Sequence, residues 1–275
     1  MYADDSSADV AADSEEEVIF RLNRAHGTMQ REAAALGLFL NETKTQWLLA
    51  PKGAEISAKG MPNASSKKLE ILGFIFDSKL SPAPYAAHLL VTMQRTLGVV
   101  RRTSALLPPS LHKKLAMSLT LGRLSTYVHL VWNVRLDSST ITTASAAALQ
   151  VVINNIARAV GRRQKVDRIP VAQLLDHAGL ESLNRLVAKG AALLAWSAAQ
   201  PNHPFHGLFL SLQMDSRTRS GTSNMMAAPS PLVAKVAIPI TNMRAVWNAW
   251  PDLRNAKTKS EAKRVIKRNI RGIPI

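Results

Sequence analysis

The sequence contains no cysteine among its 275 residues. This absence excludes a disulfide-stapled secreted domain, a thiolate zinc site, an iron–sulfur cluster and a cysteine nucleophile. The chain also lacks the G-x-G-x-x-G, G-x-x-x-x-G-K-S/T, G-x-S-x-G and H-E-x-x-H patterns. Nothing in the sequence therefore points to the nucleotide-binding, hydrolase or metalloprotease classes that these motifs mark.

Lys and Arg are absent from the first twenty residues, which carry seven Asp and Glu. Secretory signals and transit peptides need basic, acid-poor starts, so we expect an intracellular protein of the nucleus or cytoplasm.

Long hydrophobic runs are missing too. Polar residues interrupt the most apolar stretch, Leu115 to Val134, whereas a membrane span needs about 20 mainly apolar residues. No membrane span is expected.

Positive charge is in excess: 35 Lys and Arg stand against 19 Asp and Glu, for a net charge of +16. The stretch from Arg254 to Arg271 carries eight Lys and Arg among its 18 residues and a single acid, Glu261. Hydrophobic residues make up 47% of the chain, enough for a real core in one large domain or two small ones. The charge balance predicts an anionic partner.

Residues 1–80 predict mixed α and β structure. Ser14 and Glu17 form a capping box before a helical apolar stripe that ends at Gly37. Two strand-like runs follow, Gln46 to Leu49 and Leu69 to Phe76, separated by a turn-rich stretch.

From residue 81 onward the pattern becomes helical. We expect helices over about Tyr85 to Leu107, Ser110 to Val134, Ser138 to Gly161, Val171 to Ala178 and Leu180 to Ala199. Residues 200–240 lack a sustained period and predict an irregular connector. A last, basic helix follows a second capping box at Thr258 and Glu261. The chain should thus be predominantly α overall.

The opening Tyr2-Ala3-Asp4-Asp5 is the sharpest chemical signal. Adjacent carboxylates at a turn bind hard divalent cations such as Mg²⁺, and paired metals catalyse in-line phosphoryl transfer. An Asp-Asp pair is more often only a solvated turn or a helix cap, so the surrounding sequence has to decide between these interpretations.

That context resembles the palm of a reverse transcriptase. After the YADD box come Gly37-Leu38-Phe39-Leu40-Asn41-x-x-Lys44-Thr45, similar to the family's G-L-x-x-N-x-x-K-T segment, and Leu72-Gly73-Phe74, similar to its primer-grip box. Further on, the chain resembles the non-long-terminal-repeat (LINE-type) retrotransposon branch. The segments that carry this likeness are Arg101-Arg102, Leu107-Pro108, Lys113-Lys114-Leu115, Tyr127 to Trp132 and Trp247-Asn248-x-Trp250-Pro251-x-Leu253-Arg254, in which Trp250 replaces the usual Leu.

The resemblance implies an α+β palm remnant with the primer grip in residues 1–80, a helical thumb in 81–135, a helical C-terminal region in 136–199, a connector in 200–240 and a basic helical region in 241–275. It implies Asp4 and Asp5 as ligands of Mg²⁺ or Mn²⁺, Leu72, Gly73 and Phe74 as primer grip, and an RNA template with a DNA primer as partner. Lys44 lies where the family has a lysine that protonates pyrophosphate, although a merely solvated lysine is an equal alternative. The family's further catalytic Asp and its fingers lie upstream of the YADD box, so we expect this chain alone not to polymerise.

Basic side chains of the helical part could contact phosphates. The candidates are Arg101, Arg102, Lys113, Lys114, Arg162, Arg163, Lys263, Arg264, Lys267 and Arg268. Two alternatives stay open, namely a non-catalytic nucleic-acid-binding or helical interaction protein and an untranslated relic.

Core packing is the favoured role of Trp132, Trp196, Trp247 and Trp250, ahead of base stacking. His203 and His206 lack a third ligand, so no metal is expected there.

Overall fold

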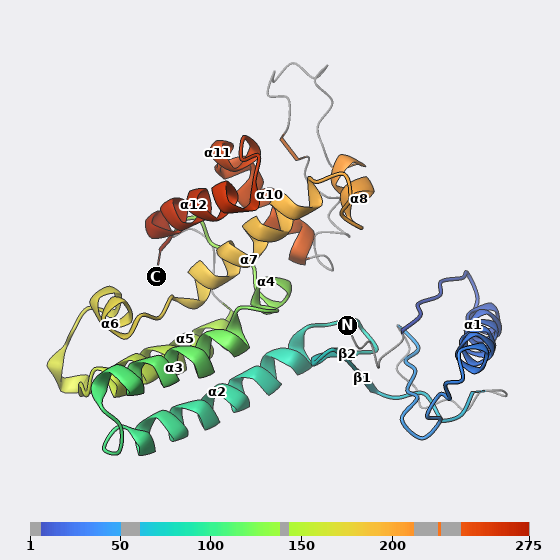
Figure 1. Cartoon of the computed structure of the whole chain (residues 1–275), viewed down its shortest axis with the longest axis horizontal. Coiled ribbons are helices and arrows are strands. Elements are labelled where there is room, and N and C mark those ends of the chain that lie inside the picture. Colours follow the sequence, from blue (N-terminus) through green and yellow to red (C-terminus); the bar gives the residue numbers. More distant parts are fainter. Residues whose placement is uncertain (1–6, 51–60, 138–142, 212–224, 227–237, 275) are drawn as a thin grey trace. The chain divides into compact units, whose positions relative to one another are not determined.

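The computed structural model describes residues 7–50, 61–137, 143–211, 225–226 and 238–274. The chain divides into two compact units, residues 1–84 and 85–275. It is mainly helical, with 62% of the structure in helices and a small two-stranded antiparallel sheet in the described part (Figure 1). The expectation of a predominantly α protein is therefore confirmed.

Helix α1 (Glu15–Ala35) in the first unit has the ends that the sequence predicts. The Ser14 hydroxyl accepts a hydrogen bond from the Glu17 amide at 3.2 Å and so satisfies one of the free N–H groups of the first turn. Gly37 has a φ of 72°, and the Leu38 amide returns to the Ala33 carbonyl at 2.9 Å. This left-handed ending favours glycine because glycine has no Cβ.

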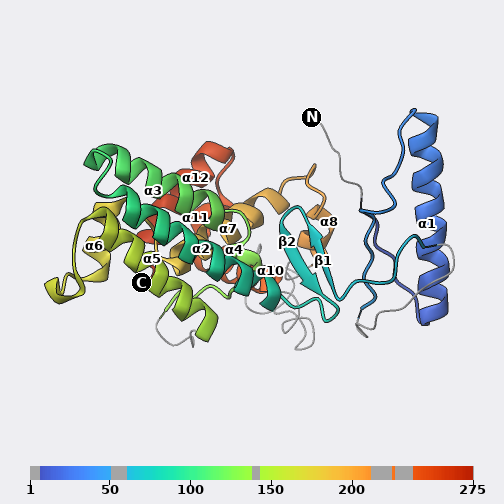
Figure 2. The ribbon, with the colours of Figure 1, turned by 90° about the horizontal axis from the view of Figure 1, so that it is seen from below.

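Strands β1 (Lys68–Ile71) and β2 (Phe74–Asp77) form one antiparallel hairpin in which Ile71 pairs with Phe74 (Figure 2). Its turn residues, Leu72 and Gly73, have φ values of 50° and 82°. Positive φ at both positions is the type I′ geometry that matches the twist of a two-residue hairpin. The run expected from Leu69 to Phe76 is thus two strands with a turn between them.

The predicted strand from Gln46 to Leu49 is wrong, because this segment is irregular. Trp47 and Leu49 are buried on alternate positions, which imitates a strand pattern without a neighbouring strand. The Trp47 indole instead donates to the Asn63 carbonyl at 2.7 Å, and the Trp47 carbonyl accepts from the Ser66 amide at 2.8 Å.

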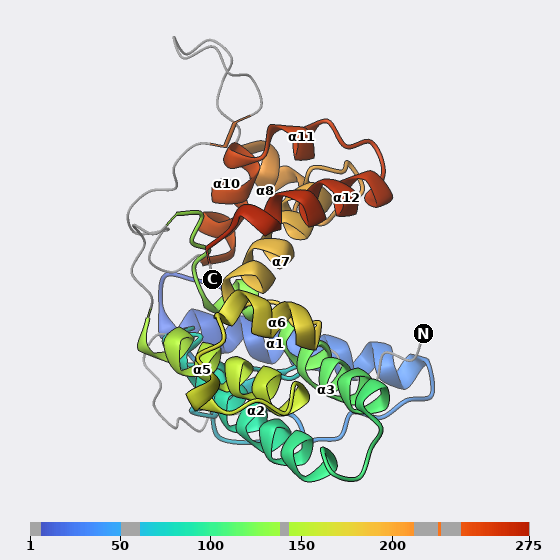
Figure 3. The same cartoon turned by 90° about the vertical axis from the view of Figure 1, so that its left-hand side faces the viewer.

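The second unit is built from helices. They are α2 (Ala83–Thr103), which begins at the boundary between the units, α3 (Pro109–Leu124), α4 (Val128–Val131), α5 (Ala144–Val160), α6 (Val171–Ala178), α7 (Leu183–Ala198), α8 (His206–Ser211), α10 (Ile238–Ala249), α11 (Pro251–Arg254) and α12 (Lys259–Asn269), with short 3-10 turns η1 (Lys165–Asp167) and η2 (Ile270–Gly272). Helix α7 contacts α4, α5, α8, α10, α11 and α12. Figure 3 shows α10, α11 and α12 at one end of α7 and α3, α5 and α6 beyond the other.

Two parts of the predicted helical pattern differ from the observed one. The single helix expected from Ser110 to Val134 ends at Leu124 and resumes as α4, because Ser125 and Thr126 are exposed and favour turns over helix. Helix α8 lies within the predicted connector. It is held by tertiary burial, since the Phe209 ring packs edge-on against Trp247 with ring centroids 4.9 Å apart.

Small side chains on α7 let the neighbouring helices approach closely. Ala188, Ala191, Ala192 and Ala195 are completely buried. A Cβ added at Gly190 would lie 2.4 Å from Nδ1 of His129 on α4, so this position requires glycine. Burial lowers the pKa of His129 from 6.5 to about 4, which keeps the imidazole neutral at physiological pH.

Stability should therefore fall as the pH decreases. Below pH 6.5 the unfolded chain binds a proton at His129 that the folded chain does not bind until the pH approaches 4. Between pH 7 and pH 5 we expect this residue to lower the free energy of unfolding by about 2 kcal/mol. Urea unfolding of the wild type and of His129→Asn at both pH values measures the difference. Equal pH dependence of the two proteins would contradict the assignment.

Three buried or half-buried asparagines fasten irregular backbone to the helices. Asn242 on α10 accepts from the Val134 amide and donates to the carbonyls of His129 and Trp132, each at 2.8 Å. Asn184 on α7 exchanges two hydrogen bonds with the backbone of Arg135, and Asn248 does the same with Met226. Each side-chain amide has both a donor and an acceptor, so it can satisfy the N–H and C=O groups of irregular backbone as a neighbouring strand would.

Candidate nucleic-acid interface

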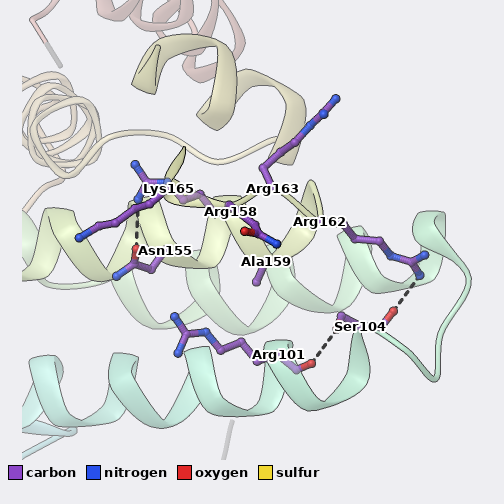
Figure 4. A pocket seen from close by; sticks show the side chains of 9 residues that line it. Arg101, Ser104, Asn155, Arg158, Ala159, Arg162, Arg163 and Lys165 are labelled. Carbon is purple, nitrogen blue, oxygen red and sulfur yellow. Dashed lines mark hydrogen bonds between the residues drawn. The ribbon is translucent and has the colours of Figure 1, made fainter. Parts of the chain in front are cut away.

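A basic cavity of about 540 Å³ lies in the second unit, residues 85–275, which we call the helical unit (Figure 4). It is lined by Arg101 and Ser104 at the end of α2, by Asn155, Arg158 and Ala159 on α5, and by Arg162, Arg163, Gln164 and Lys165 in the turn that follows α5. Five of these nine residues are cations and none is acidic. The volume is in the range of ligand pockets, roughly 300–1,000 Å³.

The turn after α5 bends the chain so that Arg162 reaches the end of α2. Arg162 has a φ of 50°, and the Arg163 amide returns to the Arg158 carbonyl at 2.9 Å. The Arg162 guanidinium then donates to the Ser104 carbonyl at 2.7 Å. Two basic segments that are far apart in the sequence, at Arg101 and at Arg162, therefore meet at one cavity.

The positive charge of the cavity is poorly compensated. Arg158 donates to Oδ1 of Asn155 at 3.1 Å, a neutral partner. The side chains of Arg101, Arg163 and Lys165 have neither an ion pair nor a hydrogen bond within the described part of the chain. The nearest acid in sequence, Asp167, accepts from the Gln164 amide at 2.8 Å and serves the turn itself. Clustered unpaired cations attract anions because none of their charge is neutralised locally.

The charge excess belongs to the helical unit as a whole. Residues 85–275 contain 26 Lys and Arg against seven Asp and Glu, whereas residues 1–84 contain nine against twelve. Anion binding by this chain is therefore expected in the second unit.

The other predicted contacts on the helical unit lie outside the cavity. Arg102 and Lys114 are exposed, and Lys113 donates to the His177 carbonyl at 2.5 Å, which ties α3 to α6. On α12, Ala262 and Ile266 are buried, and the four predicted cations Lys263, Arg264, Lys267 and Arg268 are exposed, as is Lys259. Arg268 forms an ion pair with Asp252 on α11. Helix α12 thus carries a second basic surface.

In the first unit, Leu72 and Gly73 are exposed at the tip of the hairpin, and Phe74 is buried beneath it. Lys44 is exposed on a turn held by Asn41, whose Oδ1 accepts from the amides of Thr43 and Lys44. Asp4 and Asp5 lie outside the described residues. Elsewhere in the described chain, no group of three His, Asp or Glu could hold a metal ion.

Sequence reasoning missed Ser104, Asn155, Arg158 and Gln164 as members of the site. Arg158 is a cation only four residues before the Arg162-Arg163 stretch, so this residue could have been found. The four tryptophans expected in the core, Trp132, Trp196, Trp247 and Trp250, are all buried, as the packing interpretation predicts.

Comparison of the chain with protein-family models, with curated proteins and with solved structures finds no match. Among the described helices, none is long and apolar enough to cross a membrane.

Replacement of Arg162 by glycine should separate stability from binding. A left-handed residue other than glycine costs about 1 kcal/mol, and the hydrogen bond from Arg162 to the Ser104 carbonyl contributes a similar amount, so Arg162→Gly should leave the free energy of unfolding within about 1 kcal/mol of the wild type while it weakens anion binding at the cavity. Arg168→Gly is a matched control, because Arg168 has a φ of 47° and does not line the cavity. Urea unfolding and duplex titration measure both effects. An equal loss of affinity in the two variants would contradict the site.

Proposed function

We propose that the helical unit binds the phosphate backbone of a nucleic-acid duplex, as the part of a LINE-type reverse transcriptase that holds an RNA template and its DNA primer. The observation that supports this proposal most is the cavity at which Arg101, Arg158, Arg162, Arg163 and Lys165 meet without an acidic neighbour in the lining. Guanidinium and ammonium groups bind phosphate oxygens and release the counterions condensed on the duplex.

The resemblance supplies the context of this binding. In the proposed enzyme, α2, α3 and α4 belong to the thumb, and the hairpin tip of Leu72 and Gly73 is the primer grip. Phe74 supports the tip from inside the first unit, since it is buried and packs on Phe76 at 4.7 Å between ring centroids. Helix α12 offers a further track of cations for the duplex.

Nucleotidyl transfer by Asp4 and Asp5 with Mg²⁺ or Mn²⁺, aided by Lys44, is proposed from the resemblance alone. Carboxylate oxygens are the ligands that these metals prefer. The alternative is a non-catalytic nucleic-acid-binding protein, and the cavity favours it equally, because phosphate binding by arginine needs no metal.

Titration of the purified chain with a fluorescent primed RNA–DNA duplex at 50 to 300 mM KCl tests the binding function. The logarithm of the association constant should fall linearly and steeply with the logarithm of salt concentration, by about 0.9 per phosphate contacted. Absence of binding at 50 mM, or binding that salt does not weaken, would refute the proposal. A blunt DNA duplex separates the two candidates: equal affinity favours the binding protein, and preference for the primed duplex favours the polymerase fragment.

A further inference from the structure

The end of α2 carries a second pattern besides its charge. Arg101-Arg102-Thr103-Ser104 places two arginines at the second and third positions before a serine. Basophilic serine/threonine protein kinases select substrates by this arrangement of positive charge, since acidic groups of the kinase pair with both arginines. Of the two hydroxyl residues, Ser104 has the required spacing.

Ser104 is placed where a kinase could reach it. Helix α2 ends at Thr103, and Ser104 is partly exposed in the turn that follows. Its Oγ donates to the Arg101 carbonyl at 2.7 Å, a single bond of the kind that helix ends lose by fraying. The next residues open into solvent, with Leu106 78% exposed. The segment can therefore unwind locally without disturbing the buried face of α2.

Ser104 also lines the basic cavity. The guanidinium of Arg162 lies 2.7 Å from its carbonyl oxygen, and Arg158, Arg163 and Lys165 line the same space. A phosphoserine carries a charge of about −1.5 to −2 at neutral pH and three strong acceptor oxygens. The C-terminal end of α2 disfavours this charge, whereas the cations that line the cavity favour it.

We propose that Ser104 is a phosphorylation site whose phosphate occupies the basic cavity and displaces nucleic acid from it. The γ-phosphoryl group of ATP moves to Oγ of Ser104: the new O–P bond forms, the bond between the γ-phosphorus and the bridging oxygen of ADP breaks, and the hydroxyl proton passes to the kinase. The phosphate then pairs with the cations that would otherwise hold a phosphate of the duplex. The regulatory consequence rests on the proposed function, but occupation of the cavity does not.

The first arm of the test needs no nucleic acid. The full chain is incubated with ATP and a basophilic kinase, and the modified residue is identified by mass spectrometry, with Ser104→Ala as the mapping control. Phosphorus NMR then follows the phosphate through a pH titration. Its second pKa should lie below that of the isolated phosphopeptide, because neighbouring cations stabilise the dianion. This difference should shrink in Arg158→Gln/Arg163→Gln.

A chain that is not phosphorylated at Ser104, or a phosphate that titrates like the isolated peptide, overturns the proposal. The second arm compares duplex affinity before and after modification, with kinase lacking ATP as control, and we expect a loss of at least about tenfold. Unchanged affinity overturns the regulatory claim. If the unmodified chain binds no duplex, the proposed function fails, while the NMR titration still decides whether the phosphate occupies the cavity.

Discussion

Removal of three cavity cations in Arg101→Gln/Arg163→Gln/Lys165→Gln should lower affinity for a primed RNA–DNA duplex about 100-fold at low salt. Each of these side chains lines the cavity without an internal partner in the described chain, so its loss should leave the fold intact. Arg158 and Arg162 are retained, because they hold Asn155 and the Ser104 carbonyl.

The salt dependence identifies how the affinity is lost. If the three side chains contact phosphates, the slope of log association constant against log salt should decrease by about three. Thermal unfolding should stay close to that of the wild type, since the three residues make no ion pair within the described structure. A normal slope with reduced affinity would mean that the cavity shapes the protein without touching phosphates.

A charge-matched variant separates local contact from net charge. Arg24→Gln/Lys79→Gln/Lys189→Gln also removes three positive charges, from α1, from the segment after β2 and from α7, and none of these residues lines the cavity. Lys189 is already paired with Glu181 at 3.3 Å. We expect less than about a threefold loss of affinity, because screened charges outside the contact act weakly. A loss equal to that of the cavity variant would refute the cavity as the binding site.

Local signals in the sequence predicted helix ends well. The Ser14 side-chain cap and the capping box at Thr258 mark the starts of α1 and α12, and Gly179 follows α6 in the left-handed conformation. These signals work because their hydrogen bonds join residues only a few positions apart. Segments whose structure depends on distant partners were not predictable in this way. The Gln46 to Leu49 segment and α8 owe their conformations to Asn63 and Trp247.

The same distinction applies to the candidate site. Arg101 and Arg162 are visible in the sequence as separate basic stretches, and only the fold, in which Arg162 donates to the Ser104 carbonyl, brings them to one cavity. The turn that brings Arg162 to the cavity has its left-handed conformation at an arginine. Because glycine is the usual residue in this conformation, the sequence gives no sign of the turn. The roles of Asp4 and Asp5 stay predictions of the resemblance.

Replacement of Asn242 by aspartate should reduce the free energy of unfolding by about 4 kcal/mol at pH 7, the largest single effect we expect. Asn242 is completely buried, and its amide nitrogen donates to the carbonyls of His129 and Trp132. A carboxylate would replace this donor by a charged acceptor that faces two carbonyl oxygens. The helical unit would lose the junction between α4 and α10.

The sign of the pH dependence distinguishes this cause from a simple packing defect. Burial and the facing carbonyls raise the pKa of the introduced carboxyl above its unfolded value, so the variant is most stable where the group is protonated and loses stability as the pH rises. Urea unfolding at pH 5 and pH 7 should therefore show a larger deficit in the free energy of unfolding at pH 7.

Asn242→Ala should show a deficit of about 3 kcal/mol that changes little between the two pH values, because it introduces no charge. Asn202→Asp, at an exposed turn, controls for the added charge. A deficit for Asn242→Asp below about 1 kcal/mol would mean that the three hydrogen bonds of Asn242 do not hold the helical unit together.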